Sequence, residues 1–254
     1  MDSAQTERES ISSATRKGRR LPTSEDLRAH RRLHAPGSTL YDVILGGQDG
    51  IVNVLGAVLG VAAASGNTRI IIVAALATSF AESLSMAAVA YTSSLARRDF
   101  YQGQVEREKD HIRRFSAIER EEIRQIYLAK GFTGKQLDEI VDTITSDEQR
   151  WVDVMMAEEL KISPVTRGGL LKAALIVGFA AIAGSLIPVI PFFGLPISWA
   201  VWSSITLAGG TLFAVGAYKA SVTVGVWWKS GLQLLAIGLV TALVSYVIGK
   251  TIMA

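Results

Sequence analysis

The sequence has no cysteine among its 254 residues. This absence excludes disulfide bonds, thiolate metal sites and cysteine nucleophiles. Histidine is scarce too: of three in the chain, His30 and His34 lie close to the N-terminus. The net charge of +3 is too small to favour a nucleic-acid partner. No apolar stretch follows the charges of the N-terminus, so we do not expect a secretory signal peptide there.

Acidic side chains are missing from most of two long segments, residues 42–95 and 168–254. Only three of the chain's 23 Asp and Glu residues fall inside them: Asp42, Asp49 and Glu82. In a soluble protein each amphipathic helix needs its own polar face, so charge is spread along the chain. The segregation of charge therefore predicts an integral membrane protein.

Five apolar segments are long enough for a hydrocarbon core that needs ~20 helical residues. They cover residues 42–64, 70–95, 168–190, 197–218 and 227–252. Glycine and alanine are frequent in the first, third and fourth, as expected for helices that pack closely in lipid. The predicted fold is all-α: a polytopic membrane protein with five transmembrane helices and a helical cytoplasmic domain between the second and third.

The pattern divides the chain into four regions. They are a basic N-terminal tail at 1–40, spans 1 and 2 at 41–96, a charged helical domain at 97–166, and spans 3 to 5 at 167–254. The tail is polar and is expected to be a disordered, solvated arm. Binding of the tail to anionic lipid headgroups is the alternative.

Helix-start signals occur within the charged domain. Ser116 and Glu119 fit a capping box, as do Ser146 and Gln149. Gly131 is placed like a glycine that ends a helix. We therefore expect three or four helices, the first of which continues out of span 2.

The distribution of Lys and Arg predicts the orientation in the membrane. With five spans, the basic tail, the charged domain and the turn between Lys219 and Lys229 lie on one side, whereas the opposite turns contain only Arg69. The N-terminus and the charged domain should therefore be cytoplasmic, and the C-terminus should lie outside or in a lumen. A plasma membrane and an organelle membrane are both compatible with the sequence.

Two acidic residues lie deep in the first two spans. Asp49 has Asn53 one turn further along span 1, and Glu82, near the middle of span 2, has Met86 one turn further. A lipid-facing carboxylate costs on the order of 2.5–3.5 kcal/mol there, so both should face the bundle interior. A carboxylate with a thioether suits Fe²⁺ or Mn²⁺, and a buried Glu suits proton coupling. The alternatives are an Asp49 at headgroup level and a protonated Glu82 that only links helices.

The charged domain contains acidic residues at regular spacing. Glu108, His111, Glu119 and Glu122 are separated by three, eight and three residues, so they share one helix stripe or meet on adjacent helices. A second group follows later in the domain: Met155, Met156, Glu158 and Glu159. Carboxylates at i,i+3 with an imidazole suit an oxygen-rich metal site. A solvated acidic face is the alternative.

Several motifs resemble the vacuolar iron transporter family. Residues 42–50, DVILGGQDG, resemble its D-x-I-L-G-x-x-D-G opening, and Ser85-Met86-Ala87 resembles the S-M-A core of its second span. Residues 188–191 resemble the end of its third span, and 230–232 the start of its fifth. Further matching positions lie in the charged domain: Tyr101, Glu108, Glu119, Glu122, Tyr127, Gly131 and Glu159. The resemblance covers about residues 40 to 254.

The resemblance implies a homodimer of five-span subunits that exports Fe²⁺, and often Mn²⁺, from the cytosol in exchange for protons. Asp49 and Met86 would line the transport path, in which we also place Asn53 and Glu82. The cytoplasmic domain would gather metal ions with Glu108, Glu119, Glu122, Met155 and Glu159. From their spacing we add His111 and Glu158 to this set. Zn²⁺ is a further candidate substrate, and membrane lipid is an expected partner.

Three positions depart from the family's pattern. His111 stands where the family usually has Glu, and Met156 stands where a second late Glu is common. Ala90 replaces the Glu that many members carry four residues after the residue equivalent to Met86, whereas Glu82 lies four residues before it. Residues 82, 86 and 90 share one helix face, so the carboxylate has moved two turns along that face.

Two other functions are compatible with parts of the pattern. Glu108-x-x-His111 resembles half of a di-iron carboxylate site, as in a ferroxidase, but such sites use two Glu-x-x-His pairs and the chain has one. A membrane-bound metal sensor or buffer would need the charged domain without a continuous membrane path. The sequence favours a transporter over an enzyme.

Overall fold

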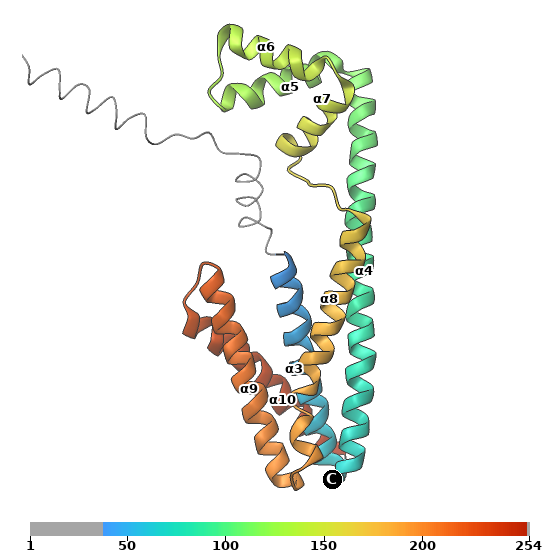
Figure 1. The fold of residues 1–254 in the computed structure, drawn as a ribbon, viewed down its shortest axis with the longest axis vertical. Coiled ribbons are helices and arrows are strands. Elements are labelled where there is room, and N and C mark those ends of the chain that lie inside the picture. The colour runs from blue at the N-terminus through green and yellow to red at the C-terminus, as the bar shows by residue number, and fades with distance from the viewer. Residues whose placement is uncertain (1–37, 253–254) are drawn as a thin grey trace, which may run out of the picture. The chain divides into compact units, whose positions relative to one another are not determined.

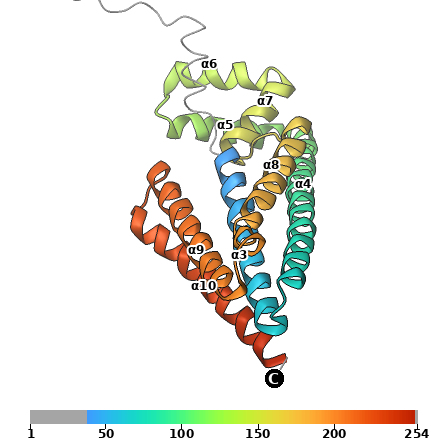
Figure 2. The same cartoon turned by 60° about the horizontal axis from the view of Figure 1, so that its bottom comes forward.

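The computed structural model describes residues 38–252, which form helices joined by short turns (Figures 1 and 2). The basic tail predicted at 1–40 lies outside the described residues except for its final positions. In chain order the helices are α3 (Ser38–Ser65), α4 (Thr68–Arg114), α5 (Ser116–Ala129), α6 (Gly134–Thr145), α7 (Glu148–Val154), the π-helix η1 (Met155–Glu159), α8 (Arg167–Leu186), the 3₁₀-helix η2 (Ile190–Phe193), α9 (Ile197–Val222) and α10 (Trp227–Ile252).

Five of these helices are long and apolar enough to cross a membrane: α3, α4, α8, α9 and α10. The prediction of an all-helical, five-span protein is therefore confirmed. α4 has 47 residues, which corresponds to a length of roughly 70 Å. A hydrocarbon core is only about 30 Å thick, so α4 extends beyond it without a break and carries α5 to α7 at its C-terminal end (Figure 1).

The turn between α3 and α4 contains two residues that suit it. Gly66 has a φ of +58°, a left-handed conformation that glycine adopts without steric cost. Asn67 then caps α4, because its side-chain oxygen accepts hydrogen bonds from the backbone N–H groups of Arg69 and Ile70, at 2.9 and 3.3 Å. Spans 1 and 2 consequently lie next to each other and share a buried apolar cluster.

The third span ends earlier than predicted. α8 stops at Leu186 instead of near residue 190, and the turn η2 follows. Pro188 and Pro191 explain the difference, because neither has the backbone N–H group that would extend an α-helix. Phe192 of η2 is 2% exposed and packs in a cluster with residues of α3, α4 and α9, so η2 closes this end of the bundle.

Glycine lets the backbone of α3 come close to two other helices. A Cβ atom on Gly50 would collide with the carbonyl oxygen of Ala181 in α8. A Cβ atom on Gly60 would lie 3.1 Å from the carbonyl oxygen of Ser245 in α10. Apolar clusters join α3 to α4, α9 and α10 as well. The helix that carries the predicted path residues of span 1 is therefore in contact with all four other spans.

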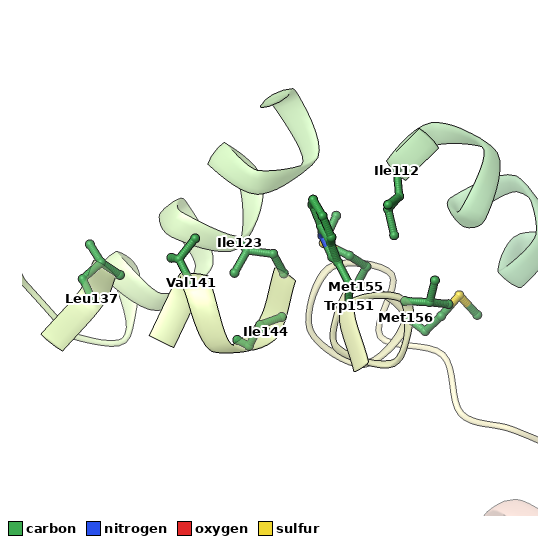
Figure 3. Packing of buried hydrophobic residues seen from close by; sticks show 9 residues of the cluster. Ile112, Ile123, Leu137, Val141, Ile144, Trp151, Met155 and Met156 are labelled. Atoms are coloured by element: carbon green, nitrogen blue, oxygen red, sulfur yellow. The ribbon is translucent and has the colours of Figure 1, made fainter. Parts of the chain in front are cut away.

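The charged domain, residues 97–166, has a small apolar core of its own (Figure 3). In α6, Leu137, Val141 and Ile144 recur at three- and four-residue spacing, which places them on one face, and each is at most 6% exposed. This face packs against Ile123 of α5 and the residues of α7. Ile112 of α4 belongs to the same cluster, so the domain is packed onto the long helix.

Neither of the two predicted capping boxes is present in the structure. α5 has Phe115 at its N-cap position and no side-chain cap, and Glu119 is buried. α7 is capped by Asp147, whose carboxylate accepts a hydrogen bond from the N–H of Arg150 at 2.8 Å. Ser146 does not serve as this cap because it ends α6, where its hydroxyl donates to the carbonyl of Thr143 at 2.8 Å.

The Asp147 cap leads to a local test. Asp147→Ala should destabilise α7 by about 1 kcal/mol, because it leaves a backbone N–H group without its side-chain acceptor. Hydrogen exchange of the α7 amides in the full-length protein should then be roughly fivefold faster than in the wild type. Ser146→Ala is the matched control and should leave these rates close to the wild-type values. Equal acceleration in both variants would contradict the assignment of the cap.

Candidate functional site

Asn53 of α3 and Glu82 of α4 meet between the first two spans, where Asn53 is exposed and Glu82 is half-buried. The amide Nδ2 of Asn53 donates a hydrogen bond to Oε1 of Glu82. The other carboxylate oxygen, Oε2, is buried and has no hydrogen-bond partner among the described residues. A buried polar oxygen without a partner costs free energy. A bound cation or proton would satisfy this oxygen.

Asp49 belongs to the same group. It lies one turn before Asn53 on α3, and its side chain is within hydrogen-bonding reach of Glu82. Two carboxyl groups and one amide from adjacent helices are thereby brought together. Met86 lies one turn after Glu82 on α4 and is half-buried, but it is outside this polar group. The structure thus brings three of the four predicted path residues together and places the fourth one turn away.

A different face of α4 borders an apolar cavity of about 330 Å³ between α4 and α8. Its lining includes Phe80, Leu84 and Phe179 and contains no charged side chain. Ser83 also lines the cavity, but its hydroxyl donates within α4 to the carbonyl of Ser79 at 2.6 Å. Such a cavity does not suit a metal cation. The polar group on α3 and α4 is therefore the better candidate for an ion path.

A second group of acidic residues lies where α4, α5 and η1 meet. Glu108 and Glu119 are only 6% and 5% exposed. Oε1 of Glu108 and Oε2 of Glu119 are buried without a hydrogen-bond partner in the part of the chain that the structure describes. Nδ1 of His111 lies 3.5 Å from Oε1 of Glu119. Glu122 and Glu159 complete what we call the acidic cluster: Glu108, His111, Glu119, Glu122 and Glu159.

Burial and mutual repulsion raise the pKa values of this cluster. Burial, followed by the charges of Glu108 and Glu122, raises the pKa of Glu119 from its ordinary value of 4.5 to about 8. Burial also raises the pKa of Glu108, while a hydrogen bond with Glu119 and the nearby His111 act in the opposite direction. The pKa of Glu159 is raised by burial and then by Glu122 and Glu108. A divalent cation would compete with protons for these carboxylates.

The π-helix η1 sends two consecutive carboxylates in different directions. Its wide turn is marked by a hydrogen bond from the N–H of Leu160 to the carbonyl of Met155 at 3.1 Å. Glu159 lies near the carboxylates of the acidic cluster. Glu158 instead pairs with Lys130 at the end of α5, with Nζ and Oε2 2.5 Å apart. Glu158, one of the predicted metal residues, therefore lies outside the acidic cluster.

Met155 and Met156 are core residues in this structure. They are 0% and 1% exposed and pack in the apolar cluster that includes Ile123 and Trp151 (Figure 3). Packing is sufficient to explain both methionines, because the flexible thioether chain fills irregular gaps. Five of the seven predicted metal residues thus form the acidic cluster, whereas Met155 and Glu158 have other surroundings.

Within residues 38–252, no three His, Asp or Glu side chains are already arranged to hold a metal ion. Binding at the acidic cluster would therefore require rotation of side chains. One neighbour of the cluster was not predicted: the ring of Phe115 lies edge-on to His111, with centroids 6.2 Å apart and planes at 79°. The four-residue spacing of these two side chains was the signal for this contact.

The chain is similar to known proteins over most of its length. The VIT family matches residues 40–250. Vacuolar iron transporter 1 of Eucalyptus grandis is 26% identical over 225 residues, which cover 88% of this chain and 90% of that protein. Vacuolar iron transporter 1 of Oryza sativa subsp. japonica is 28% identical over 242 residues, with coverage of 91% and 95%. The vacuolar iron transporter of Plasmodium falciparum is 27% identical over 222 residues, with coverage of 83% and 81%.

Proposed function

The chain belongs to the VIT family, and we propose that it carries Fe²⁺, with Mn²⁺ as a second substrate, out of the cytosol in exchange for protons. Membership of a family of iron transporters makes it a transporter and not an enzyme. A ferroxidase site would also need a second Glu-x-x-His pair, and the sequence contains one.

The observation that carries the proposal is the contact of Asn53 with Glu82 beside Asp49. Ionisable groups inside a membrane bundle are expensive, and they typically mark ion paths and proton relays. Two carboxylates match the charge of one divalent cation. The thioether of Met86, one turn further along α4, suits a first-row transition ion better than Mg²⁺ or Ca²⁺.

The acidic cluster gives the proposed path an entrance. The excess of Lys and Arg favours a cytoplasmic N-terminus and a cytoplasmic charged domain. Ions captured by the cluster would then enter the membrane from the cytosol and leave on the opposite side. We also propose that two copies of the chain form a homodimer.

Reconstituted transport tests the proposal. Purified protein in proteoliposomes should take up Fe²⁺ under anaerobic conditions, and uptake should be faster when the vesicle interior is more acidic than the outside. Entry of the ion should be accompanied by a rise in the internal pH, and a protonophore should remove the acceleration. Parallel measurements with Mn²⁺ and Zn²⁺ give the order of preference.

The possible failures are distinct. Uptake that does not respond to the pH gradient would overturn antiport but retain metal transport. Absence of uptake for all three ions, in vesicles that retain a trapped dye, would overturn transport itself. Protein-free vesicles measure the background leak of each ion.

A further inference from the structure

The distance between His111 and Glu119 is typical of two residues that bind the same metal ion. Nδ1 of His111 and Oε1 of Glu119 are 3.5 Å apart. Two ligand atoms that each bind an ion at about 2.1 Å lie about 3.0 to 3.5 Å from each other. The side chain of His111 is 46% exposed, so an incoming ion has access to the ring. His111 is also the only histidine among the described residues.

Buried carboxylate oxygens without a hydrogen-bond partner in the described part of the chain lie beside this ring. Glu108 and Glu119 are more than nine-tenths buried, and each has one carboxylate oxygen without a hydrogen-bond partner in residues 38–252. Glu108 lies one turn before His111 on α4, which places both on one helix face. Buried carboxylate oxygens are normally paired with donors or cations. The acidic cluster therefore has both the ligand atoms and a need for positive charge.

Several basic residues of this region are paired away from the cluster. Five basic residues of α4 and α5 and the turn after α5 form ion pairs with acidic residues outside the cluster: Arg113 with Glu148, Arg114 with Asp110, Arg120 with Asp142, Arg124 with Asp138, and Lys130 with Glu158. Four carboxyl groups and one imidazole remain in the acidic cluster. A divalent cation bound there would meet a mixed oxygen and nitrogen ligand set.

We propose that His111 supplies a nitrogen ligand to the ion captured by the acidic cluster and thereby sets the selectivity of this domain. Carboxylate oxygens alone suit Mg²⁺, Ca²⁺ and Mn²⁺, whereas imidazole suits Fe²⁺, Co²⁺, Ni²⁺ and Zn²⁺. His111 biases the cluster toward Fe²⁺ and against Mn²⁺ and the hard ions of the cytosol. This inference rests on the proposed function, because it assigns a role within metal capture for transport.

A simpler role for His111 makes a different prediction. The residue lies in the last turn of α4 with Arg113 and Arg114, where an imidazolium interacts favourably with the helix dipole. In that role, replacement of His111 would change the stability of the helix end and weaken the binding of all metal ions by the same factor. A change in the ratio of affinities between metals separates the two roles.

The test uses full-length, tag-free protein in detergent, with Mn²⁺ and Co²⁺ as air-stable probes. Titration calorimetry should show that His111→Glu shifts the ratio of the two dissociation constants toward Mn²⁺ on the order of tenfold. Pulsed EPR of bound Mn²⁺ should show coupling to an imidazole nitrogen in the wild type and loss of this coupling in His111→Gln. Glu106→Gln is the matched control, because Glu106 is exposed on the same helix and pairs with Lys109 at 2.9 Å.

Each outcome bears on the inference. An unchanged affinity ratio would overturn the role of His111 and leave metal capture intact. The same holds if the nitrogen coupling persists in His111→Gln because it comes from His30 or His34. If wild-type protein binds neither probe, metal capture by the acidic cluster fails as well. If His111→Glu does not fold, the EPR comparison of the wild type with His111→Gln decides.

Discussion

Replacement of Glu82 by Gln should reduce proton-driven Fe²⁺ uptake into proteoliposomes by roughly tenfold or more. Gln keeps the size of the side chain and an oxygen that can accept the hydrogen bond from Asn53, so α3 and α4 should remain packed. The change removes the negative charge and the ability to exchange a proton. A residue that only links two helices would tolerate it, whereas an ion-binding or proton-carrying residue would not.

The measurement compares initial rates with matched amounts of inserted protein. Glu106→Gln removes an exposed carboxyl from the same helix, outside the membrane, and should leave uptake at the wild-type rate. Wild-type uptake in Glu82→Gln would refute the role of Glu82 in the path. Loss of uptake together with loss of inserted protein would identify a folding defect instead, and then Glu82→Asp, which keeps the charge, decides by its transport rate.

The position of the carboxylate along α4 provides a second arm of this experiment. Residues 82, 86 and 90 share one helix face. Adding Ala90→Glu to the Glu82→Gln variant restores a carboxylate two turns away on that face. Partial recovery of uptake would show that the path needs a carboxylate on this face of α4. Failure to recover would show that the contact of residue 82 with Asn53 and Asp49 is itself required.

The membrane fold follows from the sequence because its signals are local. Long apolar segments define the five spans, and the predicted fifth span at 227–252 has the same limits as α10. The predicted helix limits are wrong where the end of one helix is set by the residues of the next element. The end of α8 is set by prolines that follow it, and the start of α7 is set by the fact that Ser146 already ends α6. Neither dependence is visible in a capping pattern alone.

The candidate sites depend on helix rotation, which the sequence specifies only in part. Spacing allows Glu108 and Glu119 to share one continuous helix or to lie on adjacent helices, and in the structure they lie on α4 and α5. The contact of Asn53 with Glu82 depends on how α3 packs against its neighbours. Residues 155–159 carry no sequence signal for a π-helix. The π-helix there changes the direction of successive side chains, so Met155 packs in the core and Glu158 reaches Lys130.

The affinity of the acidic cluster for Mn²⁺ should rise steeply with pH. The pKa of Glu119 is raised to about 8, first by burial and then by neighbouring carboxylates, so the metal-free residue holds a proton at neutral pH. A bound cation must displace this proton, so affinity should increase on the order of tenfold per pH unit up to about pH 8 and then level off. Glu119→Gln should bind more weakly at pH 8 and show a shallower dependence.

Titration calorimetry in buffers of different ionisation enthalpy measures both the affinity and the protons released. Glu121→Gln is the matched control, because Glu121 lies on the same helix but is exposed and faces Arg124 at 3.7 Å. This variant should keep the wild-type pH dependence. A wild-type affinity that does not change between about pH 6 and 8 would contradict proton displacement at the acidic cluster.

The same raised pKa determines the stability of the metal-free domain. Folded protein binds the Glu119 proton more tightly than unfolded protein, so this contribution is fully present below about pH 4.5 and is lost as pH rises through about 8. Hydrogen exchange of α5 amides should therefore accelerate with pH beyond the intrinsic chemical rate. Saturating Mn²⁺ should oppose this most strongly near pH 8, where carboxylate repulsion is greatest. Glu119→Gln should remove most of the pH effect, because its amide remains neutral throughout, and a full effect in that variant would point to the other carboxylates of the cluster.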